Sequence, residues 1–421
     1  RNGRGFLEAL VALVKCGADV LLLNTGFAGP QVTAVLDHED ASLVVHDAEF
    51  AELLAGASHG RLHLTTEELD LVAGGGTHPA PPPPGRQSRI VILTSGTTGA
   101  PRGAARSSGT ADDLIAFLSA IPLRAGERTV IAAPVFHAWG LGHLTLAVLL
   151  GSTVVLQRRF DPKAVLAAVE EHRATALVVV PVMLDKLLAA DPSRYDLSSL
   201  RVIASSGSAL PGELATRVLE GFGPVLYNLY GSTEAAYAAV ATPDDLAEDP
   251  RTAGRPPYGV RMRVVDDQGV DVPPGEQGRI FVGSSLAFGG YTDGSDKERI
   301  DGLVATGDLG VIDKKGRLTV LGRDDDMVVI GGENVHLNQV EEALLSHPGV
   351  VECAVTAEED PSFGVRLVAH VVGQADEEEL KDRVRSRVAR FAVPREVRYV
   401  EALPRNSTGK VVKRELAPGR A

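Results

Sequence analysis

The stretch that decides the fold runs VILTSGTTGAPRG from Val91 to Gly103. Its first residues are apolar and β-branched, a pattern typical of a buried strand. Small hydroxyl residues and glycines follow at once, and glycine lets a phosphate approach the backbone closely. With Arg102 behind them, backbone N–H groups here would form a concavity for an anion. A polar linker turn is the alternative, but the strand before the loop and the cation after it favour a cradle for a triphosphate.

The composition is that of an ordinary globular protein. A length of 421 residues suggests two or three domains, and the net charge of −13 argues against a general nucleic-acid binder. The two cysteines, Cys16 and Cys353, lie far apart and form no disulfide framework or zinc motif, which favours a reducing compartment. No apolar run reaches the roughly 18 residues that a membrane span needs. We therefore expect a cytoplasmic protein.

Strand and helix patterns alternate over the first half of the chain, which predicts a parallel sheet covered on both faces. Helical spacing from Leu7 is followed by an apolar run at Val20, and the same alternation resumes after the phosphate loop. The runs that predict strands are 20–23, 43–45, 130–132, 153–156, 177–180 and 202–204. Ligands of such sheets bind where strands end in loops.

Three strand ends therefore receive attention: Phe136–Gly140, Ser205–Ala209 and Tyr230–Glu234. A lone histidine is more often structural, but His137 shares its strand end with the only tryptophan and is a candidate for a pocket lining. Glu234 is either a solvated carboxylate or a magnesium ligand, because hard cations prefer oxygen ligands.

After about residue 255 the pattern changes to short strands with turn signals, which predicts an antiparallel β unit. Thr306–Gly310 is a turn whose aspartate could accept hydrogen bonds from ribose hydroxyls, and Gly322–Asp326 has the charged, turn-prone character of a hinge. The remaining residues predict a small α+β unit. It closes on a basic tail in which Lys410 follows a Ser-Thr-Gly turn.

Taken together, these motifs resemble the adenylate-forming superfamily, which includes acyl-CoA synthetases, luciferase-like enzymes and adenylation domains. Five motifs match in order: Thr94–Gly103, Tyr230–Glu234, Thr306–Asp308, Gly322–Arg323 with Gly331–Gly332, and Pro404–Lys410. The resemblance covers the chain from about Leu7 to Leu416 and is closest to fatty acyl-CoA synthetases. Members usually carry a further segment at the front, so we expect the first part of the larger domain to be incomplete.

The resemblance implies a role for each matching residue. Asp325 would be the hinge, Glu234 the magnesium ligand, and Lys410, Glu234 and Thr94 the catalytic residues. The acyl pocket would be lined by Phe136, His137, Trp139 and Gly140, and a larger side chain at Gly140 should narrow it. ATP and AMP would be bound by Thr94, Ser95, Gly96, Thr97, Thr98, Gly99, Arg102, Gly207, Ser208, Ala209, Tyr230, Gly231, Thr233, Asp308 and Arg323.

The fold that follows is α/β, with a large N-terminal domain over 1–324 and a small mobile α+β domain over 325–421. The large domain would combine layered, mostly parallel sheets and helices with a β unit. The expected reaction activates a carboxylic acid, taken to be a fatty acid, as acyl-AMP with ATP and Mg²⁺ and then transfers it to CoA. The alternatives are a ligase that loads a separate carrier protein and a non-catalytic nucleotide- or acyl-binding protein. No nucleic acid is expected as a partner, and a homodimer is compatible with the sequence.

Overall fold

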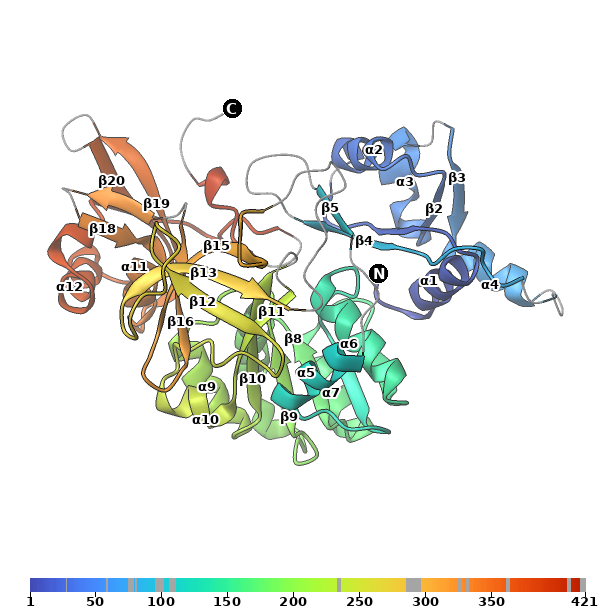
Figure 1. Cartoon of the computed structure of the whole chain (residues 1–421), viewed down its shortest axis with the longest axis horizontal. Coiled ribbons are helices and arrows are strands. Elements are labelled where there is room, and N and C mark those ends of the chain that lie inside the picture. Colours follow the sequence, from blue (N-terminus) through green and yellow to red (C-terminus); the bar gives the residue numbers. More distant parts are fainter. Residues whose placement is uncertain are drawn as a thin grey trace.

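The structure is a computed structural model of the whole chain (Figure 1). It describes residues 1–27, 29–57, 60–74, 79, 82–94, 102–105, 111–232, 236–284, 297–324, 327–330, 333–360, 364–406 and 410–416. In Figure 1 the elements at the start of the chain form one lobe, and the strands and helices after β16 gather at the opposite end.

The first lobe is built on two small sheets. In one, β1 runs parallel to β4, and β4 pairs antiparallel with β5; in the other, β2 and β3 are parallel. Helices pack around them, as the alternation of patterns predicts. The elements are α1 (Arg4–Lys15), β1 (Val20–Leu22), α2 (Gly29–His38), β2 (Leu43–His46), α3 (Ala51–Leu54), β3 (Leu62–Thr65), α4 (Thr66–Gly74), β4 (Ile90–Thr94) and β5 (Arg102–Ala105).

A six-stranded sheet in the order β11-β10-β9-β8-β6-β7 forms the centre of the protein. The pairs from β10 to β7 are parallel, as the apolar strand patterns predict, and β11 returns antiparallel to β10. Its strands are β6 (Arg128–Ile131), β7 (Thr153–Leu156), β8 (Ala176–Val179), β9 (Val202–Ser205), β10 (Leu226–Ser232) and β11 (Ala236–Ala241). The helices are α5 (Ala111–Ala120), α6 (Ala138–Leu149), α7 (Pro162–His172), α8 (Pro181–Ala189), α9 (Gly212–Phe222) and α10 (Pro243–Glu248).

Both faces of this sheet are buried, which explains why its strands read as continuous apolar runs. The larger core joins Val130, Leu177 and Ile203 to helices α6 to α9, and a second core lies on Val202 and Ala204. Asp161 caps α7 through its carboxylate, and Pro162 stands at the start of that helix, where its fixed φ and missing N–H are tolerated.

An antiparallel unit follows, as the turn signals predict. Its order is β12-β13-β15-β14, and β16 pairs with the other edge of β15. The strands are β12 (Arg261–Val265), β13 (Gln277–Gly283), β14 (Arg299–Ile300), β15 (Leu303–Ile312) and β16 (Leu318–Arg323).

The residues after β16 form a separate hydrophobic core of their own. Val335, Val340, Val355, Leu367 and Val384 are buried together in a small α+β unit. Its elements are β17 (Met327–Ile330), β18 (Glu333–His336), α11 (Leu337–Leu345), β19 (Val350–Asp360), β20 (Gly364–Gly373), α12 (Glu377–Arg387) and β21 (Glu396–Tyr399). Arg387 on α12 pairs with Glu213 on α9 at 3.6 Å, so the two units are in contact.

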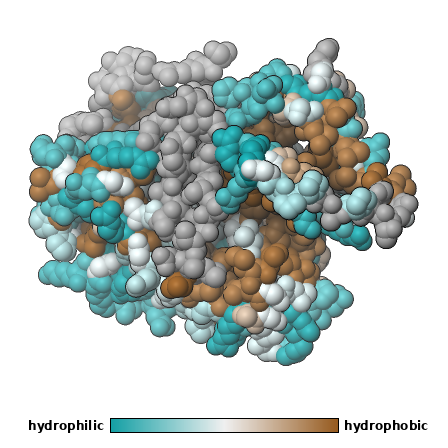
Figure 2. Space-filling view, turned by 45° about the vertical axis from the view of Figure 1, so that its right-hand side comes forward, coloured by the Kyte–Doolittle hydropathy of each residue, from teal (hydrophilic) through white to brown (hydrophobic). Residues whose placement is uncertain are grey.

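The outer surface is partly apolar. Figure 2 shows hydrophobic residues gathered on the side of the molecule that this view brings forward. Exposed apolar side chains include Val11 of α1, Leu71 of α4 and Val148 of α6. Among the helices that the structure describes, none has the length and hydropathy to cross a membrane.

Candidate active site

The phosphate-loop motif joins two paired strands. Thr94 at the end of β4 stands opposite Arg102 at the start of β5, and the pairing continues from Leu93 with Gly103 to Val91 with Ala105. The strand predicted before the loop is therefore present. A strand, not a helix, follows the loop, in agreement with the absence of a P-loop helix start. The predicted phosphate-binding residues Ser95, Gly96, Thr97, Thr98 and Gly99 lie outside the described residues.

The strand end after β6 leads into α6. His137 is the N-terminal flanking residue of this helix, and its ring stacks at a tilt on Phe136 with 4.4 Å between ring centroids. Nε2 of His137 is buried and has no hydrogen-bond partner. Burial, and next the charge of Lys410, lower the pKa of His137 to about 4. A neutral imidazole therefore lies within the field of an ammonium from the far end of the sequence.

Gly140 does not leave room for a larger side chain. A Cβ built at this position would lie 2.3 Å from the carbonyl oxygen of Pro134, which is backbone and cannot move aside cheaply. Gly140 therefore allows the start of α6 to approach the preceding turn. A larger side chain at Gly140 would therefore meet the backbone of Pro134, and the role of Gly140 and Trp139 in lining an acyl pocket stays a prediction.

Four rings form an aromatic cluster at the carboxyl ends of the parallel strands. Trp139 donates from Nε1 to the carbonyl oxygen of Val179 at the end of β8, at 2.9 Å. The ring of His143, one helical turn later, lies edge-on to Trp139 at 4.1 Å, and Phe117 lies 5.2 Å from His143 and 6.3 Å from Tyr237. Three of these rings were missed from the sequence; the spacing of Trp139 and His143 by four residues was the available signal.

The next strand end, after β9, presents the residues expected beside adenine. Ser205 and Ser206 are buried, Ser208 is half-buried, and Gly207 and Ala209 are exposed. Gly207 has φ +98°, a conformation that favours glycine. Oγ of Ser205 and Oδ1 of Asn228, which is its register partner on β10, are both buried without a hydrogen-bond partner. Two neighbouring buried polar atoms without partners indicate that a polar ligand could supply their hydrogen bonds.

The predicted ribose site is assembled by three strands. Tyr230 on β10 donates from Oη to Oδ2 of Asp308 on β15 at 2.5 Å. Asp308 pairs in register with Arg323 of β16, whose guanidinium lies 3.9 Å from the carboxylate. A Cβ at Gly307, which has φ +79°, would lie 3.1 Å from that guanidinium. Burial, and next the charge of Asp308, raise the pKa of Tyr230 well above its ordinary value, so the phenol keeps its proton.

Gly231 is also expected to contact the nucleotide, and the close approach of the neighbouring strand leaves no room for a side chain there. A Cβ there would lie 2.0 Å from the carbonyl oxygen of Ala236, at the turn from β10 into β11. Thr233 and Glu234 lie outside the described residues.

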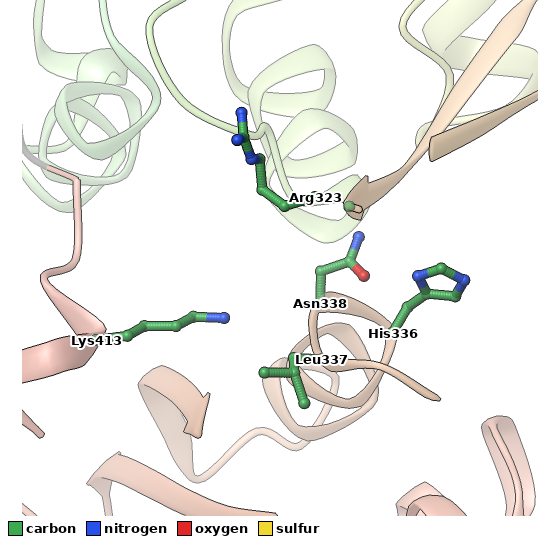
Figure 3. A pocket seen from close by; sticks show the side chains of 6 residues that line it. Arg323, His336, Leu337, Asn338 and Lys413 are labelled. Atoms are coloured by element: carbon green, nitrogen blue, oxygen red, sulfur yellow. The ribbon is translucent and has the colours of Figure 1, made fainter. Parts of the chain in front are cut away.

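The hinge motif borders a small cavity between the two units (Figure 3). Gly322, Arg323, His336, Leu337, Asn338 and Lys413 line it. Lys413 and His336 lie on opposite sides of Asn338 in Figure 3, and a Cβ at Gly322 would lie 3.1 Å from the side chain of Asn338. The predicted pivot Asp325, like Gly331 and Gly332, lies outside the described residues.

Lys410 stands on a closed turn at the end of the small unit. Its N–H donates to Oδ1 of Asn406 at 2.9 Å, and the N–H of Asn406 donates to the carbonyl oxygen of Lys410 at 2.8 Å. Residues 405 and 411 form a bridge across the same turn. The backbone of Lys410 is therefore fixed while its exposed side chain is presented to the large unit, where its charge acts on His137.

These groups form a coherent chemical site. The charge of Lys410 reaches His137 beside the start of α6, and Asp308 and Arg323 are brought together with Tyr230 from strands far apart in the sequence. Within the described part of the chain, no three His, Cys, Asp or Glu side chains gather around one point as a metal site. The polar groups of Tyr230, Asp308 and Arg323 are chemically suited to hydrogen bonds with a polar ligand such as a nucleotide.

Comparison with known proteins defines the class. The sequence model of the AMP-binding enzyme family matches residues 1–292, and that of the AMP-binding enzyme C-terminal domain matches residues 339–410. The chain belongs to the AMP-binding, adenylate-forming enzymes. It is an AMP-forming acid–thiol ligase that works through an acyl adenylate.

Relatives and solved structures support this assignment. A feruloyl-CoA synthase from Amycolatopsis sp. is 36% identical, over 99% of this chain and 86% of the relative. An indoleacetate–CoA ligase from Aromatoleum aromaticum is 33% identical, over 99% of this chain and 86% of the relative. The o-succinylbenzoate CoA synthetase of Bacillus subtilis, solved with its acyl-adenylate intermediate, superposes with a TM-score of 0.89 at 27% identity, over 100% of this chain and 87% of that one. These matches confirm the predicted fold and reaction class.

The expectation of a fatty acid substrate is not supported. The relatives named above carry feruloyl, indoleacetate and succinylbenzoate in their names, which are aromatic acids. That expectation came from the resemblance to fatty acyl-CoA synthetases, and the hydrophobicity of a pocket does not by itself separate aliphatic from aromatic ligands.

Proposed function

We propose that this chain activates an aromatic carboxylic acid with ATP and transfers the acyl group to CoA. The observation that carries the proposal is the aromatic cluster of Phe117, Trp139, His143 and Tyr237 at the carboxyl ends of β6 and β8. Ligands of parallel sheets bind at this edge. Flat rings in edge-to-face arrangements suit an aromatic guest better than a flexible chain. The aromatic acids of the named relatives agree with this choice.

In the first half-reaction, a carboxylate oxygen attacks the α-phosphorus of ATP, and pyrophosphate leaves. The loop after Thr94, closed by Arg102, would hold the β- and γ-phosphates through backbone N–H groups. Asp308 and Arg323 would hold the ribose, and Gly207, Ser208 and Ala209 would border the adenine. Lys410 would place its ammonium between the two anions, whose mutual repulsion opposes the attack.

In the second half-reaction, the thiol of CoA attacks the acyl carbonyl, and AMP leaves. The charge of Lys410 acts on His137 of the proposed acyl pocket in the present arrangement, so the small unit would rotate to admit the thiol. We place the pivot at Asp325, which divides the chain into 1–324 and 325–421. The contacts that hold the present arrangement include the exposed ion pair of Glu213 with Arg387, and exposed pairs of this kind are weak.

The metal that accompanies ATP needs few protein ligands. Mg²⁺ commonly uses one or two carboxylates together with the phosphates of its nucleotide and several waters. Glu234 would supply one such carboxylate. A magnesium ion accompanies ATP in a solved structure of the o-succinylbenzoate synthetase. When bound, the ion would neutralise charge on the phosphates.

The experiment is an ATP–pyrophosphate exchange assay with a matched panel of aromatic and straight-chain acids. We expect exchange with arylpropenoic and arylacetic acids and little with saturated acids of similar carbon number. Preformed adenylate is then offered CoA, a primary amine or a carrier protein in separate reactions. Exchange that is strongest with straight-chain acids would contradict the aromatic assignment. Product with the amine or carrier protein but not with CoA would contradict the acceptor.

A further inference from the structure

His143 carries a hydrogen-bond acceptor that the rest of the fold leaves unused. The side chain is 2% exposed, and Nδ1 lies 3.1 Å from the carbonyl oxygen of Trp139. A carbonyl oxygen can only accept, so the proton of the imidazole belongs on Nδ1. Burial lowers the pKa of His143 to about 4, which keeps the ring neutral near pH 7. Nε2 therefore presents a lone pair.

Within the part of the chain that the structure describes, that lone pair meets no donor. Nε2 of His143 is buried and lacks a hydrogen-bond partner. The rings nearest to it belong to Trp139, whose N–H is already bonded to Val179, and to Phe117, which has no polar hydrogen. A buried acceptor without a donor is costly to a fold, so Nε2 of His143 calls for a partner from outside.

The position of His143 relates it to the far end of the acid. His137 lies in the field of Lys410 and so marks the end where the carboxylate reacts. His143 stands six residues further along α6, which is a rise of about 9 Å. Trp139 lies between the two histidines on the same helix. A carboxylate joined by a two-carbon spacer to a ring with a terminal hydroxyl has a similar length.

We infer that Nε2 of His143 accepts a hydrogen bond from a phenolic hydroxyl at the end of the aromatic acid opposite its carboxylate. The inference rests on the proposed function and narrows its substrate class to hydroxylated aromatic acids. A site built to bond a substrate hydroxyl rejects the analogue without it far more strongly than an apolar pocket separates two hydrocarbons. His143 would thus determine specificity without taking part in the chemistry.

The test compares two acids that differ by one hydroxyl group. 4-Hydroxycinnamate and cinnamate are used separately in pyrophosphate exchange by the full chain. We expect kcat/KM to favour 4-hydroxycinnamate by at least about tenfold in the unmodified protein, because one unpaired buried polar atom is worth that much. This comparison needs no variant and so does not depend on whether a substituted protein folds.

Three variants then test whether His143 causes the preference for 4-hydroxycinnamate over cinnamate. In His143→Phe, which removes the acceptor and keeps a ring, the ratio of the two kcat/KM values should fall toward one. In His143→Gln, whose amide oxygen can still accept, part of the ratio should return. The control is His370→Gln, a change at a histidine that is also 2% exposed but bonds to Thr356 in the small unit, and it should leave the ratio as it is.

The outcomes separate this inference from the proposed function. Exchange with neither acid would overturn the inference, whereas the aromatic assignment falls only if the arylacetic acids of the wider panel also fail. Equal use of both acids would overturn the hydroxyl contact alone, as would a preference that survives in His143→Phe. A preference that falls in His143→Phe, returns in His143→Gln and persists in the control would support it.

Discussion

Removing one hydroxyl from Tyr230 tests the ribose site directly. Oη of Tyr230 donates to Asp308 at 2.5 Å, and a hydrogen bond to an ionised group contributes about 1.5–3 kcal/mol. Arg323, 3.9 Å from the same carboxylate, continues to balance its charge, so the lower end of that range applies. Each 1.4 kcal/mol is a factor of ten in an equilibrium constant. Tyr230→Phe should therefore raise the KM for ATP roughly tenfold.

The KM for ATP should change in Tyr230→Phe, and kcat should not. A ribose contact is made equally in the ground state and in the transition state, so kcat should change little. Pyrophosphate exchange with ATP varied at saturating acid gives both constants. The matched control is Tyr227→Phe, the same chemical change on the same strand, β10. An unchanged KM for ATP in a folded Tyr230→Phe protein, or an effect confined to the KM for the acid, would refute the assignment.

Three further outcomes follow from the structure. Lys410→Ala should lower pyrophosphate exchange by about 10²–10³ while thioester formation from preformed adenylate stays near normal, and equal loss of both half-reactions would contradict domain rotation. Gly140→Ala should lower the free energy of unfolding in urea by about 1–3 kcal/mol because its Cβ meets Pro134, whereas Gly142→Ala, with nothing within 4 Å, should not destabilise α6. The folded protein holds His143 with a pKa of about 4, so protons bind the unfolded chain preferentially below about pH 6.5. Stability should therefore fall from about pH 6.5 to 4, and His143→Phe should reduce that fall.

Local patterns predicted most of the scaffold correctly. The apolar runs that became β6, β8 and β9 are buried on both faces, so no alternation was needed to recognise them as strands. Strands β10 and β11, at one side of the sheet, were harder to recognise. Their small residues and glycine carry little strand signal, and pairing between the two strands, not local preference, makes them a ladder.

Some residues of the candidate site could be predicted from local motifs, and others could not. Asp308 and Arg323 were found because each stands in a motif, and β15 and β16 bring them together in register. Phe117, His143 and Tyr237 belong to no motif. They meet only through tertiary packing of α5, α6 and β11, which a single sequence does not encode in any local pattern. The same limit explains why the aromatic cluster was not predicted from the sequence.

The ribose site has one more consequence for turnover. Tyr230, Asp308 and Arg323 all precede Asp325, and only Lys410 comes from beyond it. On the proposed roles, the residues that bind the nucleotide belong to the large unit, and the charge that promotes its reaction belongs to the small unit. AMP can therefore stay docked while the charge is withdrawn, so the adenylate is retained between the two half-reactions. Substitutions in the small unit would then change the rate of adenylate formation and leave the affinity for the nucleotide almost unchanged.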